Sequence, residues 1–119
     1  MITELRPNEI FVFGSNLAGI HGAGAALTAK LKFGAQMGIG IGPTGKCYAI
    51  PTKDENLNAL PLWEINRHVR DFLIFSSGRS DLSFLMTRIG CGLAGYRDWE
   101  ISPMFNHCPP NVILPEEWR

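Results

Sequence analysis

The sequence predicts an α/β fold, a compact three-layer α/β/α sandwich around a mixed, mostly parallel sheet. Short apolar runs typical of buried strands alternate with segments of helical spacing, which is the order of a βαβ chain. Glycine or proline punctuates the ends of most of these runs, so turns are expected there. The length of 119 residues suits one domain, residues 1–119, with a substantial core.

Composition excludes several classes of protein. Lysine plus arginine and aspartate plus glutamate number 11 each, so no net charge favours nucleic acid or anionic membranes. We find no signal peptide and no apolar run of membrane-spanning length. Three cysteines without a CxxC pair indicate neither a disulfide framework nor a zinc site. A cytoplasmic, reduced setting is therefore expected, with no metal and no cofactor.

The first half of the chain predicts strand, helix and strand. Ile10–Phe13 is an apolar, aromatic run before Gly14, and residues 46–51 form a second strand that ends at proline. An alanine-rich helix lies between them and ends at Gly34. Residues 40–47 contain both GxGxxG and GxxxxGK, but a helix precedes the glycines and a strand follows. That order is the reverse of a nucleotide-binding loop, so a turn is predicted.

The second half predicts helix, strand, short helix and strand. An amphipathic helix starts near Pro61 and ends at residues 76–78, with His68 on its wet side. Residues 83–89 form the third strand, 98–105 a short helix, and 111–115 the last strand. Trp99 and Phe105 are expected in the core.

The stretch from Thr87 to Tyr96 follows the apolar run Phe84-Leu85-Met86 of the third predicted strand and is rich in glycine. Glycines let backbone N–H groups approach a ligand closely, which suits phosphate oxygens. A tight loop without a ligand explains the composition equally well. Ligands of open α/β sheets bind beyond the carboxyl ends of the strands, where loops 14–25, 51–56 and 90–98 are expected to meet.

These loops carry a resemblance to macrodomains. Gly14-Ser15-Asn16-Leu17, followed by Gly22-Ala23-Gly24-Ala25-Ala26, resembles the first ligand motif of that family. Residues 88–93, with Trp99-Glu100-Ile101, are similar to its second ligand loop, nearest the branch of terminal ADP-ribose protein glycohydrolase. Residues 48–53 resemble that branch's strand ending in threonine and lysine. The likeness covers roughly residues 10–114, and the chain is most like short bacterial and phage members.

The resemblance implies a macrodomain-like fold that binds ADP-ribose or an ADP-ribosylated macromolecule between the two glycine-rich loops. Asn16, beside Gly14 and Ser15, would contact the distal ribose, and Gly22, Ala23 and Gly24 would form the wall beside it. The diphosphate would be wrapped by Gly90, Cys91, Gly92, Leu93, Ala94, Gly95 and Tyr96. The resemblance assigns no residue to adenine.

Hydrolytic members of the branch use a lysine, matched here by Lys53, and an aspartate in the second loop. That aspartate position is Ala94 in this chain, and Asp98 or Asp54 are the candidate replacements. Two functions therefore stay open: removal of ADP-ribose through Lys53 and Asp98, or binding without catalysis as a reader or sequestering protein. A third class is a thiol enzyme with Cys91 as nucleophile and His21 nearby. The sequence does not predict an oligomeric state.

Overall fold

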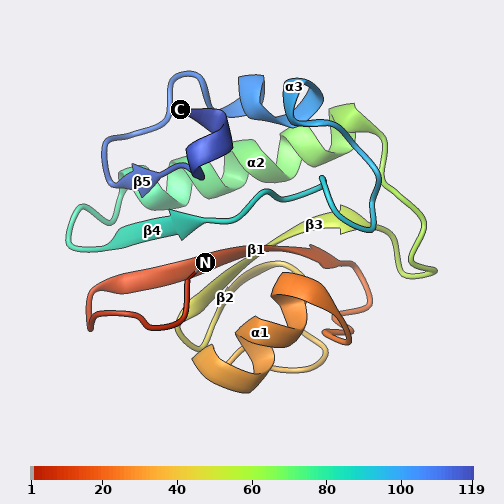
Figure 1. Ribbon diagram of the computed structural model, residues 1–119, viewed down its shortest axis with the longest axis horizontal. Helices are drawn as coiled ribbons and strands as arrows, with labels where there is room; N and C mark the ends of the chain where they lie inside the picture. The colour runs from red at the N-terminus through yellow and green to blue at the C-terminus, as the bar shows by residue number, and fades with distance from the viewer. Residues whose placement is uncertain (1) are drawn as a thin grey trace.

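A five-stranded sheet in the order β2-β3-β1-β4-β5 forms the middle layer of the molecule (Figure 1). The computed structural model describes residues 2–119. The strands are β1 (Glu9–Asn16), β2 (Gly42–Thr44), β3 (Cys47–Lys53), β4 (Ser83–Met86) and β5 (Val112–Ile113). The helices are α1 (Gly24–Phe33), α2 (Leu62–Ser77), α3 (Asp98–Ile101) and the 3₁₀ turns η1 (Ser102–Phe105) and η2 (Glu116–Trp118).

The sheet is mixed and mostly parallel, as predicted. The central strand β1 runs parallel to β3 and β4, and β5 runs parallel to β4. The exception is β2, which pairs antiparallel with β3 through Gly42↔Ala49 and Thr44↔Cys47. The sequence predicted a turn at β2, and this was wrong. Three residues that include a glycine and a proline carry no strand pattern, so only the pairing with β3 makes them a strand.

The helices cover both faces of the sheet, with α1 on one side and α2 and α3 on the other (Figure 1). Side chains of β1 alternate between the layers because successive residues of a strand face opposite ways. Phe11 and Phe13 join the core beneath α1, whereas Val12 joins the core beneath α2. The α/β sandwich expected from the sequence is therefore present.

The two long helices begin and end close to the predicted residues. Gly34 caps α1 with φ 83°, a left-handed conformation that favours glycine. None of the helices in residues 2–119 is long and apolar enough to cross a membrane. The third strand is shorter than predicted and ends at Met86, since residues 87–89 already belong to the loop that follows.

Two side chains on the α2 face of the sheet differ from expectation. His68 is buried rather than on the wet side of α2, and its Nε2 has no hydrogen-bond partner among residues 2–119. Burial lowers the pKa of His68, because the charged ring would lose its hydration. Trp99 is 71% exposed, whereas Phe105 is buried as predicted. The short helix α3 buries Ile101 instead of the tryptophan.

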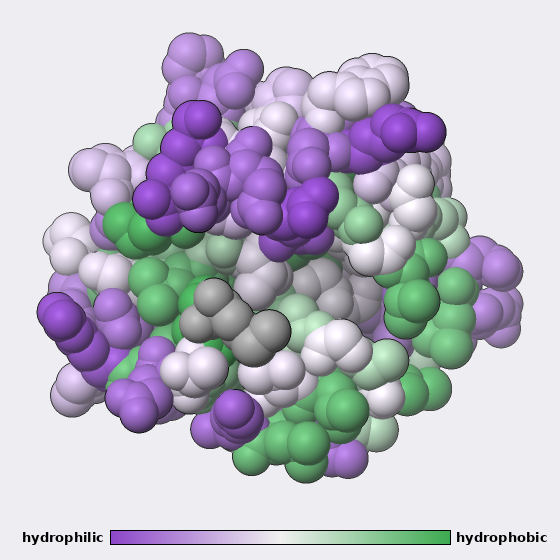
Figure 2. All heavy atoms as spheres, viewed as in Figure 1, coloured by the Kyte–Doolittle hydropathy of each residue, from purple (hydrophilic) through white to green (hydrophobic). Residues whose placement is uncertain are grey.

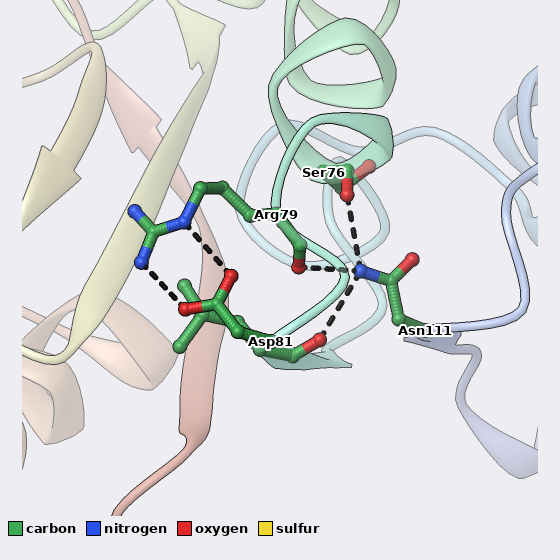
Figure 3. Close-up of polar contacts among 5 residues, drawn as sticks. Ser76, Arg79, Asp81 and Asn111 are labelled. Atoms are coloured by element: carbon green, nitrogen blue, oxygen red, sulfur yellow. Dashed lines mark hydrogen bonds and ion pairs between the residues drawn. The ribbon is translucent and has the colours of Figure 1, made fainter.

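The end of α2 is tied to the strands by one side chain, Asn111 (Figure 3). Its amide nitrogen donates to the carbonyl oxygens of Ser76, Arg79 and Leu82 at 3.0, 3.0 and 3.1 Å. This one amide therefore links a carbonyl of the last turn of α2 to two carbonyls of the connection to β4. Asn111 immediately precedes β5 and so joins α2, the connection to β4, and β5.

Candidate functional site

A cavity of about 580 Å³ opens where β1, β3 and β4 end. Its walls come from the loops that follow these three strands, at the right-hand side of Figure 1. The three loops predicted to share an edge of the sheet therefore do meet. The volume lies within the range of small-molecule sites, roughly 300–1,000 Å³.

One wall of the cavity is the N-terminus of α1. The residue before the helix, Ala23, has no polar side chain that could cap it. The first backbone hydrogen bond of the helix runs from Leu27 N to Ala23 O at 3.2 Å. The N–H groups of Gly24, Ala25 and Ala26 consequently have no acceptor within residues 2–119. All three residues line the cavity. Free N–H groups and the helix dipole give this wall a partial positive charge.

The opposite wall is the loop between β4 and α3. Two backbone bonds fix its curve, from Tyr96 N to Gly90 O at 2.9 Å and from Gly95 N to Gly92 O at 3.0 Å. The N–H groups of Gly92, Leu93 and Ala94 have no acceptor in the described part of the chain. These three residues line the cavity, so a second set of residues with free N–H groups borders it.

Gly90 and Gly92 differ in the space that a side chain would have at each position. Gly90 has φ +77°, and a Cβ there would lie 3.1 Å from the side chain of Ile101. A side chain at Gly90 would therefore be strained and crowded. A Cβ on Gly92 would meet no atom within 4 Å. Packing therefore does not require glycine at position 92, where a side chain would enter open space beside the cavity.

Lys53 supplies the free positive charge of the site. It ends β3 opposite Asn16, next to an irregularity in the register of β1 between Ser15 and Asn16. Irregularities of this kind are common near functional sites because they redirect side chains. Lys53 is half-buried, lines the cavity and makes no ion pair within residues 2–119. The described residues that line the cavity include no aspartate or glutamate.

Asn16 lines the cavity, but its amide is engaged by the protein. Its Nδ2 donates to Ile20 O at 2.8 Å, and its Oδ1 accepts from Ile20 N at 3.0 Å. The side chain is 5% exposed. Asn16 thus holds the loop before α1 in shape, and this local role is the one that the structure displays.

Neither candidate carboxylate reaches the cavity. Asp98 accepts hydrogen bonds from Arg88 and Trp118, which lower its pKa to about 2. A group that is deprotonated at neutral pH does not act as a general acid. Asp54 accepts from the backbone N–H groups of Asn56 and Asn58 and so shapes its own turn.

The thiol hypothesis loses its chemical basis. Cys91 is half-buried outside the cavity lining, and burial together with nearby Asp98 raises its thiol pKa to about 11. A thiol with so high a pKa is a poor nucleophile at neutral pH. His21 is buried elsewhere, with its Nε2 2.9 Å from Gln36 O.

The cavity includes most of the predicted ligand residues but not all of them. The lining lacks Cys91, Gly95 and Tyr96, and the Tyr96 hydroxyl donates to Leu60 O instead. Sequence reasoning missed Ile20 and Leu57, although both lie in the loops at the strand ends. Position after a strand was the signal available for them. Within residues 2–119, no three His, Cys, Asp or Glu side chains gather as a metal site would need.

Comparisons with known proteins support the fold. No protein-family model and no curated protein sequence matches the chain. A solved structure of a protein of unknown function from Bacteroides thetaiotaomicron is similar, with a TM-score of 0.60 and 17% sequence identity. The match covers 82% of this chain and 77% of that chain. At this level of identity the likeness concerns the fold alone.

Proposed function

We propose that the cavity binds ADP-ribose or an ADP-ribose derivative. One observation carries the proposal: the cavity is lined by Lys53, which makes no ion pair within residues 2–119, and by residues 24–26 and 92–94, whose backbone N–H groups have no acceptor there. Backbone amides at a helix start and in a glycine-rich loop are typical binding groups for phosphate oxygens. The macrodomain-like motifs lie in these same loops.

The charge of the lining favours an anion. Lys53 is a free cation, the second cation Arg88 is paired with Asp98, and no carboxylate among the lining residues would repel a diphosphate. A neutral protein therefore has a local site whose charged and partly charged groups are positive. The distal sugar would lie beside residues 22–24, and the diphosphate would bridge the two sets of amides.

Binding without hydrolysis is the form of this function that the site favours. Cleavage of a glycosidic bond needs proton transfer to the leaving group or activation of a nucleophile. Lys53 is the one ionisable group without an ion-pair partner among the described lining residues. The candidate carboxylates, Asp98 and Asp54, are held outside it. We therefore propose a reader or sequestering protein for ADP-ribose or ADP-ribosylated macromolecules.

Calorimetry with ADP-ribose tests the proposal. We expect saturable binding, weakened roughly ten- to hundredfold in Lys53→Met, because this variant keeps the aliphatic stem and loses a charge-assisted contact. Lys30→Met, which removes an exposed charge from the last turn of α1, is the matched control and should bind like the wild type. Absence of binding by the wild type at millimolar ADP-ribose would refute the proposal.

A turnover assay separates binding from hydrolysis. The substrate is a protein mono-ADP-ribosylated on glutamate, and the product is free ADP-ribose. We expect no release above the rate of Lys53→Met. Release that depends on Lys53 would instead show a hydrolase and would refute the non-catalytic form of the proposal.

A further inference from the structure

The polar side chains that line the cavity are almost all engaged by the protein. The Ser15 hydroxyl donates to Gly40 O, Thr87 Oγ1 donates to Val12 O at 2.7 Å, and Thr52 Oγ1 donates to Ser15 O at 3.4 Å. Asn16 is doubly bonded to Ile20, and Arg88 is bonded to Asp98. Ser15, Thr52 and Asn16 are each at most 5% exposed. Among the described lining residues, Lys53 makes no ion pair, and Arg88 keeps only the N–H donors that Asp98 does not use.

The mouth of the cavity is apolar. Ile20, Leu57 and Leu93 each come from a different loop, and their side chains are 47%, 48% and 78% exposed. Figure 2 shows apolar surface at this right-hand end of the molecule, over the ends of β1 and β3. Three apolar side chains therefore lie at the edge of a lining that also holds free amides, Lys53 and the paired Arg88.

A base is read by side chains that match its hydrogen-bonding edge, typically amides, carboxylates or arginines. A site that makes such bonds rejects a ligand lacking the matching groups by about 10⁴-fold. The rim here offers aliphatic groups instead. Apolar contact with the face of a base is tolerant, because every base has such a face.

We propose that this cavity takes nucleoside diphosphate sugars through their diphosphate and does not discriminate between bases. The inference rests on the proposed diphosphate site and adds the ligand class. The amides at residues 24–26 and 92–94, with Lys53, hold the diphosphate, while the base rests on Ile20, Leu57 and Leu93. ADP-ribose is then one member of a wider class of ligands.

Calorimetry with a matched series of probes tests this selectivity. The probes are ADP-ribose, guanosine diphosphate ribose, uridine diphosphate ribose and ribose 5-phosphate. We expect the three nucleotide Kd values to agree within about fivefold and ribose 5-phosphate to bind at least roughly a hundredfold more weakly. A preference above roughly fiftyfold for one base overturns the inference and leaves diphosphate binding intact. Failure of all three nucleotides overturns the proposed function together with it.

A rim variant gives a second measurement. Leu93→Ser removes an exposed side chain, so the fold should be retained, as circular dichroism will show. We expect all three nucleotides to weaken by the same factor, about three- to tenfold, because each base loses the same apolar contact. A loss confined to one nucleotide would show that the loop reads that base and would overturn the inference.

Discussion

Arg88 and Asp98 form a bidentate ion pair that closes the glycine-rich loop at its two ends. Arg88 Nε lies 3.0 Å from Asp98 Oδ1, and Nη2 lies 2.7 Å from Oδ2. The indole N–H of Trp118 donates to the same carboxylate at 2.6 Å. The pair therefore connects the glycine-rich loop to the C-terminal turn η2 as well as closing the loop.

Replacing Asp98 with asparagine should destabilise the protein in a pH-dependent way. Its contacts lower the carboxyl pKa from 3.8 to about 2, so their contribution is complete above pH 3.8 and is lost as pH falls toward 2. Urea unfolding of wild type and Asp98→Asn between pH 2 and pH 7 should show curves that differ near neutrality and converge near pH 2. Parallel curves over the whole range would contradict this assignment.

The control for that variant is Asp81→Asn. Asp81 also makes a bidentate pair, with Arg79. These two residues are only two positions apart, and their side chains are largely exposed.

The rate at which Cys91 is alkylated distinguishes the two variants. We expect Asp98→Asn to speed the reaction, because it loosens the loop and removes an effect that raises the thiol pKa. Asp81→Asn should react like the wild type.

Alanine at position 90 should lower the stability of the protein, whereas alanine at position 92 should lower only its affinity for ADP-ribose. Gly90→Ala meets a positive φ and the side chain of Ile101, so the free energy of unfolding should fall by about 1–2 kcal/mol. Gly92→Ala meets nothing in the free protein and should leave stability within about 0.5 kcal/mol of wild type. Its methyl group would occupy space beside the free amides, so ADP-ribose affinity should fall roughly tenfold. Unchanged affinity in Gly92→Ala would place the ligand elsewhere.

His68 should make the protein sensitive to mild acid. Burial lowers its pKa from 6.5, assisted by Arg67 and opposed by Glu64 and Asp71. The unfolded chain then binds the proton first, so stability is complete above pH 6.5 and falls as pH drops below that value. His68→Leu should remove this part of the pH dependence. Between pH 7 and pH 5, the Tm of the wild type should therefore fall by about 4 °C more than the Tm of His68→Leu.

The exposed His107 provides the comparison for His68. His107→Leu replaces an exposed ring with the same aliphatic side chain and controls for the substitution itself. An equal response of the two leucine variants to pH would show that burial of His68 does not control its protonation.

Asn111 should tolerate no carboxylate. Asn111→Asp replaces a donor with an acceptor that faces three carbonyl oxygens, so the free energy of unfolding should fall by about 2–3 kcal/mol. Asn106→Asp, at an exposed position after η1, makes the same chemical change without those partners and should have little effect. Urea unfolding at pH 7 measures both, and equal effects would contradict the role given to Asn111.

Local sequence patterns predicted most of the fold. The apolar runs of β1 and β3, the spacing of α2 and the glycine after α1 each reflect physics within a few residues, and each prediction is confirmed. The meeting of three loops followed from parallel strands, whose carboxyl ends share one edge. The strand β2 was missed because its pairing with β3, and not its own residues, defines it.

The details of the site depend on partners distant in sequence. Asp98 is removed from the cavity by Arg88, ten residues before it, and by Trp118, twenty residues after it. Neither spacing is a recognisable motif. Similarly, the burial of His68 is decided by how α2 lies on the sheet, which the charged neighbours of that histidine did not reveal.

The short outer strands also determine how the sheet ends. On one side Pro43 occupies the middle of β2, and on the other β5 is two residues long and is followed closely by Pro115. Proline lacks the N–H group that an added strand would need, and a short edge offers few free backbone groups. Both borders of the sheet therefore resist strand-by-strand growth into aggregates.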